Sequence, residues 1–538
     1  MKRLLVGLGT ALLLTACGGG TSTPSTGSSP DKNTTDNNTT TNNPPPTKEI
    51  PFVVCPEQNG TGSLTILGKI EYERIQPQHS GGATILDTSN ITNESAKDII
   101  VTAVDASGAT IASTCTDGSG NYALKEIPES TSLKVRAYAK MKNSTWDVKV
   151  VDNTHSDALY LIEGSLRDSG TTDSSRDLKA SYANDQSAPF AILDSVHQAM
   201  DKVLTANSSA TFPALKLNWS LNNISSSTFK PKIGQIVTTL YSNSNIYVLG
   251  DKSDTDEFDN HVIIHEWGHY FEDMFSRADS IGGSHSAGQK LDIRLAFGEG
   301  FGNAFSAIVT DDPLYYDTLQ NGTQGSNMNI ESATPYVPGY FSEASIQRIL
   351  YDLYDSNNDG ADSLSMGFTP LYNTLVGAEK TTPAFTSIFT FITALKNENA
   401  DSSAKIDAIT SAENISDISD IYGTNNNAFL YAYLRVGDSI RISTNTSNGV
   451  PNKLENHKYI RFSINRRKSY RIRVDSLSSN SPDPDFELFK TSSFIKVGQG
   501  YNSGTSEVKD ITLDEGEYLL DIYDANFKSR VDFSVTIN

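Results

Sequence analysis

The chain has 538 residues, of which 37% are hydrophobic and 20% charged, so most of it can fold and two to four domains are expected. Its 43 basic and 64 acidic side chains give a formal net charge of −21. That balance argues against nucleic acid and anionic membranes as partners, and it suits a protein outside the cytoplasm.

The N-terminal segment, residues 1–17, has the form of a secretion signal: two positive charges, an apolar run and small residues before a cysteine. Its ending, LTAC, resembles the lipobox of bacterial lipoproteins. The resemblance implies cleavage before Cys17, lipidation of that residue and, with Gly18 next, delivery to an outer membrane. An ordinary signal with an incidental cysteine is the alternative. No later stretch reaches the length of a membrane span, so the membrane would be contacted through the lipid alone.

The segment that follows, residues 18–48, contains no aromatic and almost no aliphatic side chain. Such a composition cannot bury enough surface to offset the entropy lost on ordering. We interpret it as a disordered tether that holds the body of the protein away from the membrane.

Residues 49–163 alternate apolar and polar side chains between Gly/Asp/Ser turns, which predicts an all-β domain. Once Cys17 is acylated, Cys55 and Cys115 remain, and an even pair in an exported domain indicates a disulfide. The stretch TCTDGSGNYAL, residues 114–124, resembles the carboxypeptidase-regulatory-like, transthyretin-type β-sandwich. This resemblance implies a structural or binding module without chemistry of its own.

Residues 164–427 combine helical periodicity with a few strands, which predicts an α+β domain. Apolar residues recur at three- and four-residue spacing in SAPFAILDSVHQAMDKVL, and SEASIQRILYDLYD and PAFTSIFTFITALK are two further expected helices. The run SNIYVLGD, residues 244–251, is a short strand. It is either an edge strand that pairs with an extended substrate or an interior strand.

Residues 428–538 return to strand patterns, among them DPDFELF and GEYLLDIYD. These two strands resemble the pre-peptidase C-terminal type of β-sandwich that is appended to secreted bacterial peptidases. The resemblance implies a role in stability, substrate tethering or surface association. The fold class expected for the whole chain is therefore multidomain: a β-sandwich, an α+β domain and a second β-sandwich.

Three histidines stand four residues apart in HVIIHEWGHYFEDMFSR, residues 261–277. On a helix, side chains at i and i+4 share one face about 6 Å apart, so two imidazoles can bind one Zn²⁺, whereas three would span roughly 12 Å. The glutamate selects the pair, because HEWGH, from His265 to His269, is an H-E-x-x-H motif with Glu266 facing the catalytic water. A chance motif in a long chain is the alternative, which the apolar flanks disfavour.

A third ligand is needed, and two geometries are known for this motif. The metzincin type requires a histidine where Phe275 stands and is excluded. The glutamate type requires a glutamate on a second helix, and LAFGEGFGNAFSAIV supplies Glu299, followed by small residues that permit close helix packing. Glu272 and Asp273 are nearer, but they share the helix of the histidines and would need an improbable bend.

The combined pattern HEWGHYFEDMFSR…AFGEGFGNAFSA…YFSEASIQRILYDLYD resembles the gluzincins, the thermolysin/fungalysin-like group, and in particular bacterial lipoprotein zinc peptidases. It implies a zincin-like peptidase domain over residues 164–427. In thermolysin-like enzymes the position of Asn303 is usually an aspartate that supports the first histidine; an uncharged Asn should support His265 more weakly.

The resemblance also implies a mechanism. Zinc lowers the pKa of its water, Glu266 takes the proton and passes it to the leaving amine, and a His or Tyr stabilises the oxyanion. Since no histidine lies between His285 and His457, a tyrosine is required: Tyr340 is the first choice and Tyr336 the second, against an ordinary packed tyrosine.

The remaining histidines have plainer interpretations. His261 is expected to be a hydrogen-bonded residue at the helix entry, and His285 a surface or cleft-lining residue that could contact substrate.

The stretch DSNNDGADS has the spacing of a calcium loop. Its candidate ligands are Asp355, Asn357, Asp359 and Asp362, the last in place of the missing bidentate glutamate. An ordinary Asp/Asn/Gly turn is the alternative.

The sequence thus predicts a surface-anchored zinc metallopeptidase that hydrolyses peptide bonds in proteins. One zinc is expected, with calcium as an optional brace, and the outer membrane is the expected location, on its periplasmic face or at the cell surface. Two other hypotheses stay open: a non-catalytic adhesin or binding lipoprotein, and a zinc hydrolase of a non-peptide cell-envelope substrate. Metal content and peptide cleavage discriminate among the three.

Overall fold

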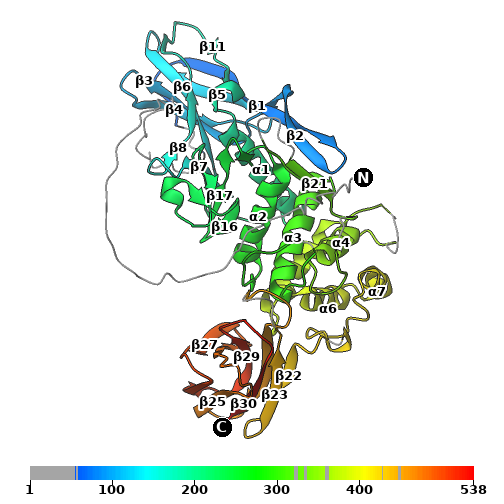
Figure 1. The fold of residues 1–538 in the computed structure, drawn as a ribbon. Coiled ribbons are helices and arrows are strands. Elements are labelled where there is room, and N and C mark those ends of the chain that lie inside the picture. The colour runs from blue at the N-terminus through cyan, green and yellow to red at the C-terminus, as the bar shows by residue number, and fades with distance from the viewer. Residues whose placement is uncertain are drawn as a thin grey trace, which may run out of the picture.

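The computed structural model describes residue 55 and residues 58–286, 288–319, 325–332, 336–357, 363–426, 428–445 and 450–538. The predicted lipobox at Cys17 and the predicted tether at 18–48 lie outside these ranges. Figure 1 shows the N-terminal strands at the top, the helices in the middle and the C-terminal strands, coloured orange to red, at the bottom.

The N-terminal part is made of strands, as its alternating pattern predicts. They are β1 (Leu64–Ser80), β2 (Ala83–Ser95), β3 (Ile99–Asp105), β4 (Thr110–Cys115), β5 (Asn121–Ile127), β6 (Ser132–Lys142), β7 (Asp147–Asp152), β8 (Ala158–Leu159) and β9 (Leu161–Glu163). β1 pairs with β2 and β5 in one sheet, while β3, β4, β6 and β7 belong to a second sheet. A disulfide joins Cys55 to Cys115, with Cα atoms 5.9 Å apart, as the cysteine count predicts.

Further short strands lie between residues 167 and 329. They are β10 (Arg167–Asp168), β11 (Ser174–Ser175), β12 (Leu178–Ala180), β13 (Leu215–Trp219), β14 (Ile224–Ser225), β15 (Gln235–Ile236), β16 (Leu240–Ser242), β17 (Asn245–Val248), β18 (Gly250–Asp251), β19 (Asp254–Thr255), β20 (Leu314–Asp317) and β21 (Gly325–Asn329). Most of them extend the two sheets, while β14 pairs with β15 and β18 with β19 in two separate two-stranded sheets. The ten-stranded sheet has the order β16-β17-β13-β7-β6-β3-β4 along its main path. In it, β13 pairs in parallel with β7, with Leu217 opposite Val150.

Strand pairing therefore crosses the boundary expected between residues 163 and 164. The seven-stranded sheet, which contains β1 and β2, crosses it as well, because β2 pairs with β21. One hydrophobic core includes Ile66, Val101, Val150, Leu217 and Phe271, so side chains from both sides of the expected boundary are buried together.

The strand predicted at 244–251 is interior and not an edge. β17 is hydrogen-bonded in parallel to β13 and in antiparallel fashion to β16, so the edge strand of this sheet is β16. The edge interpretation of that segment is wrong, because the hairpin partner that covers it, Leu240–Ser242, is too short to be recognised from the sequence pattern.

The helices are α1 (Ala188–Ala206), α2 (Asn260–Phe275), α3 (Ile293–Thr310), α4 (Glu343–Tyr354), α5 (Phe368–Thr374), α6 (Ile388–Glu398) and α7 (Ser403–Ala412). α1, α4 and α6 occupy the three stretches in which the apolar spacing predicts helices. None of the helices in the described ranges is both long enough and apolar enough to cross a membrane.

Small residues let α2 and α3 approach closely. A Cβ atom added to Gly268 would lie 3.3 Å from the Cα of Gly302, and one added to Gly300 would lie 2.6 Å from the side chain of Ile346 on α4. Larger side chains at these positions would force the helices apart. Gly268 and Gly302 therefore set the distance between the two helices that carry the predicted metal ligands, and Gly300 sets the distance between α3 and α4.

In the described residues of the C-terminal part, the regular elements are strands. They are β22 (Tyr431–Tyr433), β23 (Ser439–Thr444), β24 (His457–Ile464), β25 (Lys468–Ser476), β26 (Pro484–Lys490), β27 (Ile495–Gly500), β28 (Ser506–Leu513), β29 (Gly516–Asp524) and β30 (Val531–Ile537). They form two sheets, β22-β24-β29-β26-β27 and β23-β30-β25-β28, around a hydrophobic core of their own. This arrangement agrees with the β-sandwich expected for residues 428–538.

A buried ionic network joins the C-terminal sheets to the start of α3. Arg294 donates to Asp292 at 2.9 and 3.1 Å and to Asp521 on β29 at 2.9 Å. His457 lies 2.8 Å from the other oxygen of Asp521, and the hydroxyl of Tyr459 donates to Asp292 at 3.0 Å. All five side chains are buried, so the two parts share a dry interface and are not merely linked in sequence.

Candidate metal centre

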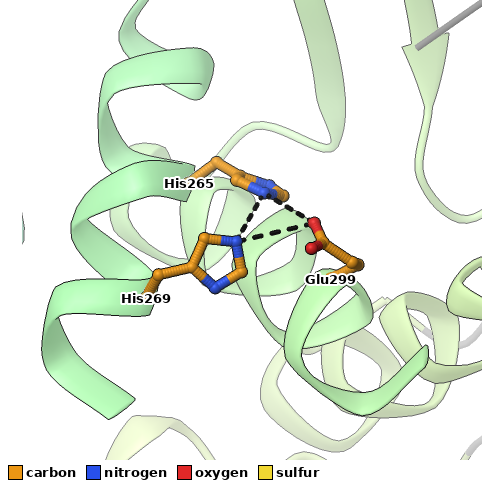
Figure 2. Close-up of side chains that lie close together, drawn as sticks. All are labelled: His265, His269 and Glu299. Carbon is orange, nitrogen blue, oxygen red and sulfur yellow. Dashed lines mark hydrogen bonds and ion pairs between the residues drawn. The ribbon is translucent and has the colours of Figure 1, made fainter. Parts of the chain in front are cut away.

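Two helices bring the predicted ligands together. α2 carries His265 and His269 one turn apart, and α3 carries Glu299 opposite them (Figure 2). The Nε2 atoms of the two histidines are 3.2 Å apart, and Oε2 of Glu299 lies 3.2 Å from the first and 3.5 Å from the second. All three side chains are buried, with exposed fractions of 1%, 6% and 1%.

The donor set fits a single Zn²⁺. Ligands at 2.0–2.2 Å from a tetrahedral ion stand roughly 3.3–3.5 Å from one another, close to the three separations found here. Oε1 of Glu299 is buried and has no hydrogen-bond partner in the described part of the chain. Burying an ionised carboxylate without hydrogen-bond partners costs free energy unless a cation compensates its charge. The residues present therefore match what a zinc ion requires.

Hydrogen bonds to the far ring nitrogens orient both imidazoles. Nδ1 of His265 lies 2.9 Å from Oδ1 of Asn303, whose amide nitrogen in turn donates to Gln347 on α4 at 3.0 Å. Nδ1 of His269 lies 3.4 Å from Oε2 of Glu272. An acceptor at Nδ1 leaves Nε2 free as the ligand atom. Asn303 thus contacts the far ring nitrogen of His265, and Glu272 contacts that of His269.

Glu266 lies on α2 between the two histidines and is buried. Its Oε2 accepts a hydrogen bond of 2.7 Å from the backbone N–H of Tyr241, in the edge strand β16. Burial raises the pKa of this carboxyl group, although the neighbouring His265 and His269 oppose the shift. A carboxylate with a raised pKa in a dry site is a better proton acceptor than one in water.

The contacts of the two predicted oxyanion tyrosines lie elsewhere. The ring of Tyr340 packs on Phe341 and Phe389, with centroids 5.2 and 5.1 Å apart. The hydroxyl of Tyr336 contacts Glu413 and Arg348. No contact in the described ranges joins either tyrosine to the ligand cluster. Sequence position after the third ligand is a poor guide here because the chain between α3 and α4 first forms a hairpin, β20–β21.

Tyr315, in β20, does reach the cluster. Its ring centroid lies 6.2 Å from that of His265, edge to face. Burial raises the pKa of the Tyr315 hydroxyl, and the charges of Asp317 and Glu266 raise it further, so the hydroxyl stays protonated. Nothing in the sequence pattern distinguishes this tyrosine from a packing residue.

His285 is buried and not on the surface, which corrects that part of its interpretation. Its exposed fraction is 3%, and its Nε2 lies 3.3 Å from Oε2 of Glu299 and 3.5 Å from Oε2 of Glu343. His261 is buried at the entry of α2, as predicted, with Nε2 3.0 Å from the carbonyl oxygen of Asp312.

The structure also contains a cluster of three aspartates that the sequence analysis did not predict. One carboxylate oxygen from each of Asp254, Asp256 and Asp317 lies within 4.8 Å of the other two. Burial raises the pKa of all three, most strongly that of Asp256. At the predicted calcium loop, the N–H of Asn357 donates to Asp355 at 3.2 Å, while Asp359 and Asp362 lie outside the described residues.

Gly302 is the residue of α3 that packs against the His265 imidazole. A Cβ atom at this position would lie 2.8, 2.9 and 3.0 Å from Cε1, Nδ1 and Nε2 of His265. We therefore expect Gly302→Ala to displace the imidazole and to weaken zinc binding by about 10- to 100-fold, the range seen when ligand orientation is lost. Competition with a chromophoric chelator measures the affinity.

The matched control is Gly377→Ala, since a Cβ atom there meets nothing within 4 Å. It should leave zinc affinity unchanged. Equal affinities in the two variants would contradict the expected clash.

A model of the mycolysin C-terminal domain family matches residues 198–411, from within α1 to within α7. That domain occurs in peptidases, and the match includes α2, α3 and the ligand cluster but less than half of the chain. It relates this part of the chain to peptidases. No curated protein has a sequence that matches the chain.

Solved structures with similar parts include the pre-peptidase C-terminal domain of a collagenase from Bacillus anthracis. It is 13% identical, covers 20% of this chain and 94% of its own, and has a TM-score of 0.17. The surface-associated copper-binding protein CorA from Methylomicrobium album BG8 is 9% identical over 20% of this chain and 98% of its own, with a TM-score of 0.16. The lysozyme inhibitor PliG from Aeromonas hydrophila is 14% identical over 20% and 97%, with a TM-score of 0.14.

Proposed function

We propose that this protein is an exported zinc metallopeptidase of the gluzincin type that hydrolyses peptide bonds in proteins. The observation that carries the proposal is the convergence of His265 and His269 from α2 with Glu299 from α3, at separations of 3.2–3.5 Å. Glu266, on the same turn of helix as the histidines, supplies a proton acceptor. The family match to a domain that occurs in peptidases supports the same class.

In this proposal His265, His269 and Glu299 hold the zinc ion. When bound, zinc lowers the pKa of water and polarises a carbonyl group. Glu266 accepts the proton of the attacking water and passes it to the leaving amine. Tyr315, whose ring packs edge to face on that of His265, supplies a protonated hydroxyl that can donate to developing negative charge. The buried surroundings strengthen each of these interactions, because little water is present to screen them.

Strand β16 is the element most suited to bind an extended peptide. It is the edge of the ten-stranded sheet, and its Tyr241 contacts Glu266. An extended chain that adds to a sheet edge gains main-chain hydrogen bonds whatever its side chains are. A substrate bound there lies beside the proton acceptor.

The other expectations from the sequence complete the proposal. Cleavage before Cys17 and lipidation of that cysteine anchor the protein at the outer membrane, and the C-terminal β-sandwich, of pre-peptidase type, stabilises the enzyme or tethers substrate. Calcium at the Asp355 loop is an optional brace.

Metal removal tests the proposal most directly. The Cys17→Ser chain, which cannot be lipidated, should contain one zinc per molecule and cleave casein or a peptide library. A chelator should abolish cleavage, and added zinc should restore it. Elemental analysis and a protease assay measure the two properties.

Three outcomes separate the hypotheses. Zinc with cleavage supports the peptidase. Zinc with no cleavage of any peptide contradicts the proposal and favours a hydrolase of a non-peptide envelope substrate. Absence of zinc contradicts it and favours the adhesin.

A further inference from the structure

The connection between α2 and α3 brings a third imidazole to the metal centre. His285 extends from this connection, and its Nε2 lies 3.3 Å from Oε2 of Glu299, the same oxygen that faces the two predicted ligand histidines. On its other side Nε2 lies 3.5 Å from Oε2 of Glu343, a buried oxygen with no hydrogen-bond partner in the described ranges.

Both ring nitrogens of His285 face oxygens that can only accept hydrogen bonds. Nδ1 lies 3.1 Å from the carbonyl oxygen of Gly283, and Nε2 faces the two carboxylates. Nε2 of His285 therefore lies within hydrogen-bonding distance of Oε2 of Glu299, in a ring whose other nitrogen contacts the backbone. Oε1 of Glu299 has no hydrogen-bond partner among the described residues. The His285 imidazole and the two predicted ligand histidines, which all face Oε2, therefore orient the carboxylate.

The loop that carries His285 is held by the C-terminal β region. The Asn452 side chain donates to the carbonyl oxygens of Gly282 and Ser284 at 2.9 and 3.1 Å. The Lys453 ammonium donates to the same Ser284 oxygen at 2.9 Å and to Gln289 at 2.7 Å. Asn452 is 1% and Lys453 9% exposed, so these hydrogen bonds are shielded from water.

Gly283 makes this close contact possible. Its φ of +97° lies in the region that glycine adopts most easily, and a Cβ atom there would lie 2.8 Å from Nδ2 of Asn452. The backbones also join beyond the loop, since Asp292 N donates to Asn452 O and Leu454 N to Lys290 O, both at 3.0 Å. The C-terminal segment is thus hydrogen-bonded to the loop on both sides of His285.

We propose that Asn452 and Lys453 are positioning residues of the metal centre: they fix the loop so that His285 orients the Glu299 carboxylate. The C-terminal β region then sets the affinity of a metal site on the other part of the chain. This inference rests on the proposed function, because it assigns to Glu299 a zinc ion to bind. Partners one step removed from a metal typically change its affinity 10- to 100-fold.

The test measures zinc affinity of the full chain by chelator competition, well below the melting temperature. We expect His285→Ala to weaken binding by about 10- to 100-fold, and Lys453→Met and Asn452→Ala by about 5- to 50-fold. In the His285→Ala background, either second substitution should weaken binding by less than about twofold, because its effect passes through the lost imidazole.

Lys458→Met is the matched control. Lys458 is also a buried lysine of the C-terminal region, 8% exposed, and donates to the carbonyl oxygen of Phe429, away from the loop. It should lower the melting temperature as much as Lys453→Met and leave zinc affinity unchanged. If Asn452→Ala does not fold, the zinc affinity of Lys453→Met is compared with that of Lys458→Met alone.

The outcomes separate this inference from the proposed function. Unchanged zinc affinity in Lys453→Met, or losses that add to that of His285→Ala, overturn the positioning role and leave the peptidase standing. A wild-type chain that binds no zinc overturns both.

Discussion

Replacing Glu266 with glutamine is expected to lower kcat for peptide hydrolysis by about 100- to 10,000-fold, the range attributed to a general base. The amide has nearly the same shape and cannot accept the proton that the buried carboxylate takes. Zinc content should stay at one per chain, because Glu266 is not among the three ligands. Steady-state kinetics with a fluorogenic peptide, together with elemental analysis, measures both.

Glu398→Gln makes the same chemical change at an exposed position of α6 and should retain full activity. If Glu266→Gln lost its zinc, Glu266 would belong to the ligand set; if it kept its activity, the assignment of the general base would fail.

Replacing Arg294 with methionine is expected to lower the free energy of unfolding by about 3–5 kcal/mol, the usual cost of leaving buried charges without their partner. Arg294 is 3% exposed and neutralises Asp292 and Asp521 at the contact between α3 and β29. Methionine fills a similar volume and cannot compensate either carboxylate. Urea unfolding, followed by fluorescence, gives the difference.

Arg471 offers the contrast, since its pair with Asp510 has even shorter distances, 2.7 and 2.8 Å, but lies at the surface. Arg471→Met should change stability little. Similar losses in both variants would mean that the interface network contributes no more than a surface ion pair.

Local patterns predicted much of the fold. The helices α1, α4 and α6 were recognisable because the spacing of their apolar residues reflects which face is buried, and the order of strands, helices and strands follows from composition. The C-terminal sheets were recognisable for the same reason. The parallel pairing of β7 with β13 was not, since it joins segments more than 60 residues apart and leaves no local signal.

In the candidate site, too, the residues with a local sequence signal were predicted and those placed by distant contacts were not. His265, Glu266 and His269 are neighbours on one helix, so their spacing alone predicted a common face. Glu299 was predicted because the glutamate type of zinc site requires a glutamate on a second helix, and the small residues after it permit close helix packing. His285 and Tyr315 reach the cluster only through loops and a hairpin, whose paths depend on distant contacts such as that of Asn452 with Gly282. The chemical roles of all these residues remain predictions.

The parallel ladder between β7 and β13 bears on how this protein could be divided. Separating the chain after Glu163 would strip β13 of one neighbour and expose a row of unpaired N–H and C=O groups, a template for aggregation. A fragment that contains the helices but lacks the N-terminal strands should therefore aggregate. A chimeric protein that includes these helices must also include the N-terminal strands to stay soluble.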